Sequence, residues 1–185
     1  MRVDSRTWVV NAALIILLTV AAYLPAMTGG FVFDDNICIT DNPMVNAGDG
    51  LSRFWFTTEA PDYYPLTWSA WWVERRFWGD NATGYHVVTI LLHAANAVLL
   101  WVILRRLKIP GAWLAGLAFA IHPVNVATAA WISEQKNALS MLFYLTAILL
   151  YLPAPSLCPM EARFCQTEQK LRPTAAATVS SMGNS

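Results

Sequence analysis

Long apolar stretches separated by polar segments dominate the first 152 residues of the chain. The first stretch, "WVVNAALIILLTVAAYLP" (8–25), contains one amide side chain and no charge. About 20 apolar residues of helix cross a bilayer, so this stretch predicts a transmembrane helix over residues 8–26. A cleaved signal peptide is the competing interpretation because Arg2 and Arg6 precede the stretch, but "AMTGG" is a poor cleavage site.

A second apolar stretch predicts a span over residues 86–104, and a basic cluster (105–108) follows it directly. Four polar residues in this stretch share one helix face, because they follow one another at steps of three, four and three: His86, Thr89, His93 and Asn96. Polar groups in hydrocarbon need partners, so we expect this face to turn towards other helices.

The third predicted span, residues 111–132, contains a break. Residues 111–122 would form only about 18 Å of helix, too short for a hydrocarbon core of about 30 Å, so the helix must continue past Pro123. The proline predicts a kink there and disfavours helical geometry at His122. Small residues recur at every fourth position, which favours close helix packing: Ala112, Gly116 and Ala120.

A shorter apolar stretch predicts a fourth span over residues 138–152. After it the pattern stops, and residues 153–185 contain scattered Pro, Ser, Thr and Ala with no apolar period. Such a composition predicts a disordered tail. The chain is therefore expected to consist of an all-α transmembrane domain of about four helices (1–152) and a tail (153–185).

Composition agrees with a membrane protein and excludes some classes of function. The chain is 56% hydrophobic and 13% charged, with a mean hydropathy of +0.42. Twelve basic residues balance twelve acidic ones, and no basic stripe with interleaved aromatics occurs, so nucleic-acid binding is excluded. The three cysteines lack the spacing of a metal or redox motif and are interpreted as unpaired thiols: Cys38, Cys158 and Cys165.

Loop charges predict how a multi-pass chain is oriented. With a cytoplasmic N-terminus, eight of the twelve basic residues lie inside: Arg2, Arg6, Arg105, Arg106, Lys108, Arg163, Lys170 and Arg172. The positive-inside rule favours this orientation. It also places nine of the twelve acids outside, eight of them in the long first loop (27–85), which is therefore predicted to be an acidic extracytoplasmic element.

Within that loop, the segment "PLTWSAWWVERRFWG" (65–79) mixes four tryptophans with Glu74, Arg75 and Arg76. Aromatic and cationic side chains together are typical of the headgroup layer, so the segment predicts an interfacial helix on the outer membrane surface. The alternative is a helix that packs on the loop itself.

Several stretches together resemble one protein family. They are "FVFDDNICITDNPMV", "YYPLTWSAWWVERRFWGDNATGYHVVTILLHAANAVLLWVILRRL", "PGAWLAGLAFAIHPV" and "AWISEQKNALSMLFYLTAILLYL". In this order they are similar to the N-terminal membrane part of the O-mannosyltransferase-like proteins that join a transmembrane region to tetratricopeptide repeats. That resemblance implies a partial GT-C fold. It also implies a transferase that uses a polyprenyl-phosphate-linked sugar donor on the extracytoplasmic side and moves a hexose to a hydroxyl group, for example one on a protein.

By the same likeness, Asp34 and Asp35 match the family's acidic pair. Transfer of a sugar to a hydroxyl needs a carboxylate that takes the acceptor proton and a second group that steadies the leaving phosphate. Adjacent acids in a strand-like segment point in opposite directions, so one is expected to act as the base. The other would hold a divalent cation, a loop contact or nothing. Without the likeness, such a pair is more often a solvated turn.

His122 matches the histidine of the family's His-Pro motif and has two interpretations. Protonated, it would bind the donor's phosphate; neutral, it would hydrogen-bond an unpaired carbonyl in the helix bundle. Lys136 is the second candidate for phosphate binding, and its alternative is an ion pair with Glu134 of little energetic worth. We interpret three residues as packing between helices of the bundle and not as ligands, because no carboxylate lies near them on the same helix: His86, His93 and Asn96.

The chain departs from the family pattern at three positions. Asn125 and Ala127 replace a histidine and a glutamate, and Gln135 stands where an arginine is usual. The family also has about twice as many spans, and the tail matches nothing in it. The alternative hypothesis is therefore a catalytically inactive, truncated membrane fragment or an interaction protein. A small transporter is a third hypothesis, disfavoured because no second half repeats the first.

Overall fold

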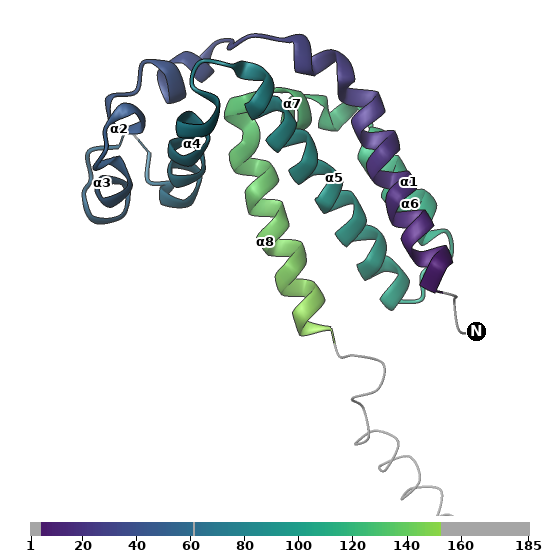
Figure 1. Ribbon diagram of the computed structural model, residues 1–185. Coiled ribbons are helices and arrows are strands. Elements are labelled where there is room, and N and C mark those ends of the chain that lie inside the picture. The colour runs from purple at the N-terminus through teal and green to yellow at the C-terminus, as the bar shows by residue number, and fades with distance from the viewer. Residues whose placement is uncertain (1–4, 61, 153–185) are drawn as a thin grey trace, which may run out of the picture. The chain divides into compact units, whose positions relative to one another are not determined.

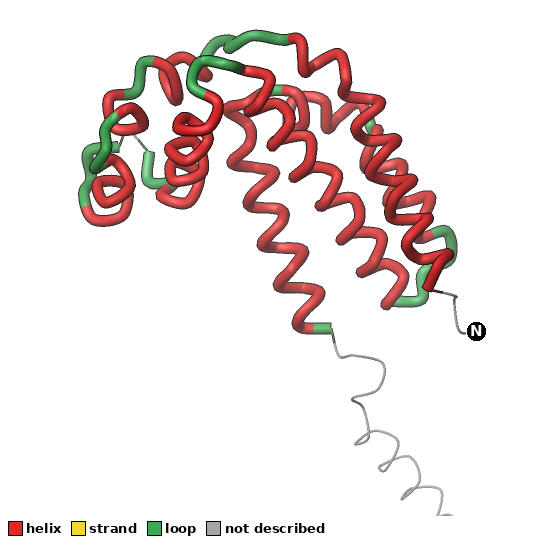
Figure 2. The backbone as a smooth tube through the Cα atoms, viewed as in Figure 1, coloured by secondary structure: helices red, strands yellow, loops and turns green. Residues whose placement is uncertain are grey.

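The computed structural model describes residues 5–60 and 62–152, and all regular elements among them are helical (Figures 1 and 2). In chain order these elements are α1 (Ser5–Tyr23), η1 (Leu24–Thr28), the π-helical turn η2 (Asn36–Thr40), α2 (Pro43–Asn46), α3 (Gly50–Phe56), α4 (Pro65–Trp78), α5 (Ala82–Arg106), α6 (Ala112–Ile121), η3 (Pro123–Asn125), α7 (Val126–Ala130), η4 (Ile132–Glu134) and α8 (Gln135–Tyr151). The described residues up to Leu149 belong to one compact unit. The all-α prediction is confirmed for the described residues, and the predicted tail lies outside them.

In the part of the chain that the structure describes, two helices are long and apolar enough to cross a membrane, namely Arg6–Thr28, which joins α1 to η1, and α5. A third span is present if α6 and the segment Pro123–Ala130 count as one broken helix, since the two are bent by 49°. The predicted fourth span forms α8, which has 17 residues. Two or three spans therefore fit a membrane protein, and the fourth stays a prediction.

The contact between α5 and α6 depends on small residues. Ala112, Gly116 and Ala120 are all buried on the face of α6 that packs on α5. A Cβ atom added to Gly116 would lie only 2.8 Å from the Cβ atom of Trp101, closer than real Cβ contacts allow. The predicted ridge of small residues is therefore confirmed, and it lets the two backbones approach closely.

The polar face predicted for the second span is also confirmed. His86, Thr89, His93 and Asn96 are all buried. Neighbouring helices supply partners for two of them: His93 Nε2 donates to the Ala120 carbonyl (3.0 Å), and Asn96 Nδ2 donates to the Ala138 carbonyl (2.8 Å). The polar side chains therefore tie α5 to α6 and to the start of α8.

The break in the third span explains one of these bonds. His122 is extended (φ −66°, ψ 132°), as the following proline predicts. The amide of Val124, which would reach the Ala120 carbonyl in a continuous helix, instead donates to His122 Nδ1 (3.2 Å). The Ala120 carbonyl is thereby left free to accept the bond from His93.

The helices place two sets of charges at opposite ends of the compact unit (Figure 1). The start of α1, the end of α5 and the start of α6 lie at one end, with Arg105 and Arg106. At the other end lie residues 29–60 and 62–81, which include α2, α3 and α4, and the segment 123–134 between α6 and α8. All nine acids of the described residues belong to this second end, which we call the acidic end. Which side of a membrane it faces stays a prediction.

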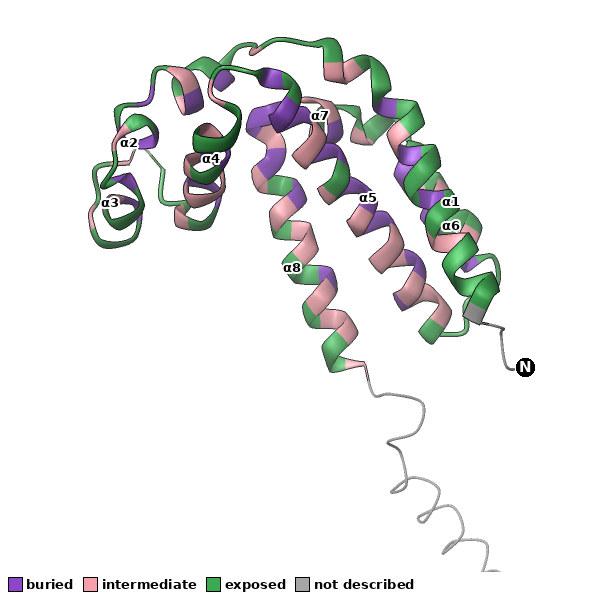
Figure 3. Ribbon diagram, in the orientation of Figure 1, coloured by how far each residue is buried: buried purple, intermediate pink, exposed green. Residues whose placement is uncertain are grey.

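The first loop forms a packed cluster at the acidic end. Phe54 of α3 stacks on Trp68 of α4 (5.7 Å between ring centroids), and Tyr85 and Ile132 contribute to the same buried core. One face of α4 is therefore buried (Figure 3). This burial agrees with the alternative interpretation of the segment, a helix that packs on the loop itself. Its other face exposes apolar side chains: Leu66, Val73 and Phe77. Contact of that face with lipid stays a prediction.

The charged residues of α4 bind other parts of the first loop. They were expected instead to lie in the lipid headgroup layer. Arg76 donates to the Val45 carbonyl (3.1 Å) and to the Ala47 carbonyl (2.6 Å), and its guanidinium lies over the Trp72 ring. Arg75 donates to Asn46 Oδ1 (2.9 Å) and pairs with Asp80. These backbone carbonyls at the end of α2 lie about 30 positions before Arg76 in the chain, so the sequence around Arg76 does not predict the contact.

Gly116→Val is expected to destabilise the helix bundle, because the added side chain would collide with Trp101. Overpacking of this kind costs about 1–3 kcal/mol. Thermal melting in detergent should show a lower apparent Tm for Gly116→Val, and Ala118→Val, at an exposed position of the same helix, serves as the control. Equal Tm values for the two variants would contradict the close packing of α5 and α6.

Candidate functional site

A tight turn follows the first span and holds the two candidate catalytic acids. The Asp35 amide donates to the Val32 carbonyl (3.0 Å), and the Val32 amide donates back to Asp35 Oδ2 (3.0 Å). Phe33, inside the turn, has a positive φ of 47°. The expected strand-like geometry is therefore wrong: these reciprocal bonds close residues 32–35 into a turn, and Asp34 and Asp35 lead into η2.

Asp35 is fully buried and bound at both oxygens. Its Oδ1 accepts the amide of Ser133 (2.8 Å), which lies 98 positions further along the chain in η4. Burial of a carboxylate is costly unless it is hydrogen-bonded, and amide donors on both oxygens meet that need. The second acid of the pair was expected to hold a divalent cation, a loop contact or nothing. The structure shows Asp35 in a loop contact.

Asp34 is exposed, in contrast to the buried Asp35 beside it in the sequence. It lies in the same electrostatic environment as Lys136, because both side chains act on the Cys38 thiol. Burial raises the pKa of Cys38, Asp34 raises this pKa further, and Lys136 opposes the rise. Cys38 is unpaired, as expected, and Cys158 and Cys165 lie outside the described residues.

Lys136 is half-buried in the first turn of α8, and its Nζ atom lies 3.5 Å from Glu134 Oε1. The predicted ion pair is therefore formed. An anionic ligand at Lys136 would have to compete with Glu134, so the pair sets the local charge close to neutral when no ligand is bound.

His122 is exposed, and its ring caps the turn that follows α6. Since Nδ1 accepts the amide of Val124, the proton of the neutral ring lies on Nε2. The neutral interpretation expected a bond to an unpaired carbonyl, but the carbonyl freed at this break is taken by His93. Within residues 5–60 and 62–152, no hydrogen bond or ion pair joins His122 to Asp34, Asp35 or Lys136.

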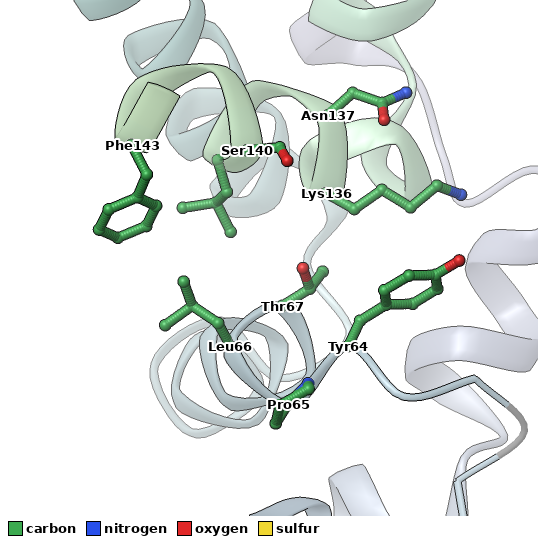
Figure 4. Close-up of a pocket in the computed structure, with 9 residues that line it drawn as sticks. Tyr64, Pro65, Leu66, Thr67, Lys136, Asn137, Ser140 and Phe143 are labelled. Carbon is green, nitrogen blue, oxygen red and sulfur yellow. The ribbon is translucent and has the colours of Figure 1, made fainter. Parts of the chain in front are cut away.

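A cavity of about 360 Å³ lies between the start of α4 and the start of α8 (Figure 4). Lys136 and Tyr64 line one side of it, and Leu66 and Phe143 line the other. The remaining lining residues are Pro65, Thr67, Asn137, Leu139 and Ser140. The cavity therefore has a polar side with one cation and an apolar side, which suits an amphipathic ligand.

Sequence reasoning identified Lys136 but missed its neighbours in the cavity. Lys136, Ser140 and Phe143 follow one another at steps of four and three, so their shared helix face was available as a signal. Thr67 and Leu66 come from a segment about 70 positions away, and no local pattern pairs that segment with α8.

Glu74 is a buried acid that sequence reasoning assigned to the membrane surface. Gln135 Nε2 donates to its Oε1 (2.5 Å), and the indole of Trp71 donates to Gln135 Oε1 (3.0 Å). Glu74 Oε2 has no hydrogen-bond partner among the described residues. Burial raises the pKa of Glu74 to about 7, and the bond from Gln135 opposes this rise. Gln135, at one of the departures from the family pattern, therefore links α4 to α8.

Glu74 should make the stability of the fold fall as the pH rises. The unfolded chain loses this proton near the ordinary pKa of 4.5, whereas the folded chain keeps it until about pH 7. The contribution of Glu74 to the free energy of unfolding is therefore fully present below pH 4.5. It falls by on the order of 3 kcal/mol as the pH rises through 7. Glu74→Gln stays neutral and should remove this fall, which melting at pH 5 and pH 8 would measure. Asp62→Asn, at an exposed position, is the control, and an unchanged pH dependence in Glu74→Gln would contradict the assignment.

Comparisons with known proteins identify relatives but no solved fold. No family model matches the chain, and no solved structure matches it significantly. It is 30% identical over 156 residues to protein O-mannosyl-transferase F38B6.6 of Caenorhabditis elegans, covering 76% of this chain and 23% of the relative. It is 28% identical over 163 residues to human protein O-mannosyl-transferase TMTC4, covering 74% of this chain and 22% of the relative.

A third relative, mouse protein O-mannosyl-transferase TMTC3, is 28% identical over 152 residues, covering 76% of this chain and 16% of the relative. The chain thus spans less than a quarter of the length of these three curated relatives. Over about three quarters of its own length it resembles the protein O-mannosyl-transferases, which confirms the family likeness predicted from its motifs.

Proposed function

We propose that the chain forms part of a membrane glycosyltransferase that moves a hexose from a polyprenyl-phosphate donor to a hydroxyl group of a protein. The names of the relatives point to mannose as the hexose and to a protein as the acceptor. The observation that carries the proposal is the pairing of a buried Asp35, bound at both oxygens, with an exposed Asp34. This pairing fixes a free carboxylate at the acidic end, which we place on the extracytoplasmic side.

Asp34 acts as the general base in this proposal, and Asp35 is a positioning residue. The acceptor hydroxyl loses its proton to Asp34 as its oxygen attacks the anomeric carbon. The bond between that carbon and the donor's phosphate breaks, and the polyprenyl phosphate leaves with the bonding electrons. Asp35 is not available to the acceptor, because both its oxygens accept backbone amides, those of Val32 and Ser133.

Lys136 stabilises the leaving phosphate, and the cavity beside it receives the first part of the polyprenyl chain. About 360 Å³ is near the lower limit of ordinary ligand pockets, which fits a phosphate with a few carbon atoms. The phosphate would lie at Lys136 and the chain against Leu66 and Phe143 (Figure 4). A cation near the phosphate lowers the energy of the charge that develops as the bond breaks.

His122 and a divalent cation are further candidates for contact with the phosphate. The neutral His122 ring can donate from Nε2 without losing its bond to Val124. Mg²⁺ is commonly bound by one or two carboxylates together with substrate phosphates. Asp34 is the exposed carboxylate of the pair, so in that arrangement it would bind the cation in place of acting as the base.

Asp34→Asn is expected to abolish sugar transfer while the fold persists. The assay uses a chimera in which residues 8–152 replace the matching segment of the Caenorhabditis elegans relative, with mannosyl transfer to a peptide measured in membranes. Loss of a general base lowers the rate by about 10²- to 10⁴-fold. Asp41→Asn, at an exposed acid of the same loop, is the matched control and should keep the rate. Transfer by Asp34→Asn at the full rate would disprove its role as base.

Asp35→Asn separates positioning from chemistry in the same chimera. It should lower the Tm and the rate together, because an amide side chain cannot accept the amides of Val32 and Ser133 with both its polar groups. A chimera that folds and inserts but transfers no sugar, even without substitutions, would favour the alternative function, a membrane interaction protein.

A further inference from the structure

Phe33 occupies a backbone conformation that its side chain disfavours. It is the second residue of the turn closed by Val32 and Asp35, and its φ of 47° lies in the left-handed region. A turn position of this kind is ordinarily taken by glycine or asparagine, because a bulky side chain there collides with the backbone. A phenylalanine at this position is therefore a strained residue, and such residues gather at functional sites.

Burial of the ring does not compensate for this strain. Phe33 is 83% exposed, so it removes little apolar surface from water. Its recorded ring contact is with Trp131, at 6.1 Å between centroids and an interplanar angle of 64°. The turn is held instead by Asp35, whose side chain bonds the residue before Phe33 and also Ser133.

Trp131 is fixed by the same carboxylate. It is extended (φ −96°, ψ 123°) between α7 and η4, two residues before the amide that Asp35 accepts. One buried carboxylate therefore binds the backbone close to two aromatic residues from distant parts of the chain. The exposed Asp34, the proposed base, follows Phe33 directly in the sequence.

We propose that Phe33 and Trp131 form an aromatic platform on which the hexose ring of the donor stacks. The C–H bonds on one face of a hexose suit the electron-rich face of an aromatic ring, while the hydroxyls point elsewhere. Stacking there would hold the sugar next to Asp34, which makes Phe33 a specificity-determining residue. This inference rests on the proposed function, since it names the part of the donor that contacts the turn.

An aromatic anchor in the lipid headgroups is the competing role for an exposed Phe33. An anchor requires neither a left-handed backbone nor a fixed ring partner, because apolar side chains in ordinary conformations serve equally well. The observed strain and the contact with Trp131 favour a ring whose direction matters. The two roles predict opposite results for a leucine at this position, which is apolar but has no ring face.

Three substitutions in the chimera test the platform: Phe33→Tyr, Phe33→Leu and Phe33→Gly. Phe33→Tyr should keep kcat/KM for the mannosyl donor, whereas Phe33→Leu should lower it about fivefold to tenfold, the scale of one aromatic contact. Phe33→Gly should lose at least as much activity, yet its Tm should equal or exceed that of the parent, because glycine relieves the strain. Full kcat/KM in Phe33→Leu would overturn the platform and favour the lipid anchor.

A binding measurement on the full chain separates this inference from the proposed reaction. Saturation-transfer NMR, with saturation of aromatic protons and mannose 1-phosphate as the probe, should show transfer to the sugar ring protons. Transfer should persist in Phe33→Tyr and Asp34→Asn but weaken severalfold in Phe33→Leu. If Asp34→Asn alone abolishes catalysis and Phe33→Leu changes neither measurement, the platform is wrong and the proposed function stands. If Asp34→Asn keeps its catalytic rate while saturation still depends on Phe33, the sugar site stands and the proposed base is wrong.

Discussion

The acidic end of this structure depends on the buried carboxylate of Asp35. Its two oxygens accept the amides of Val32 and Ser133, and so join the exit of the first span to the segment between α7 and α8. Without these donors a buried carboxylate would be strongly unfavourable, so the contact is specific for this arrangement of backbone. Phe33 and Asp34 lie in the turn that this carboxylate closes, and Trp131 lies two residues before Ser133.

The break after α6 brings the second half of this contact into place. Pro123 ends the helix, and the chain then passes through η3, α7 and η4 before α8 begins, which keeps Ser133 at the acidic end. The break also leaves the Ala120 carbonyl free for His93, so the polar face of α5 and the interruption of the third span stabilise one another. A helix that is irregular at membrane depth is acceptable when neighbouring groups satisfy its backbone in this way.

Much of the helix bundle could be predicted from the sequence, because local patterns encode it. The lengths of the apolar stretches predicted α1 and α5. Small residues at every fourth position predicted the close helix packing at Gly116, and Pro123 predicted the extended backbone at His122. The contacts of Asp35 and Glu74 could not be predicted, since they link segments 98 and 61 positions apart. The turn at Phe33 was also hidden, because phenylalanine is not a residue that signals a left-handed backbone.

The proposed function requires Asp34 to lie outside the membrane, at the opposite end from the basic end of α5. Labelling with a membrane-impermeant thiol reagent tests it directly, with Asp34→Cys and Arg106→Cys each placed in a chain whose own cysteines are replaced by serine. Position 34 is expected to react in intact cells, and position 106 is expected to react only after permeabilisation. Reaction of position 34 only after permeabilisation would contradict it.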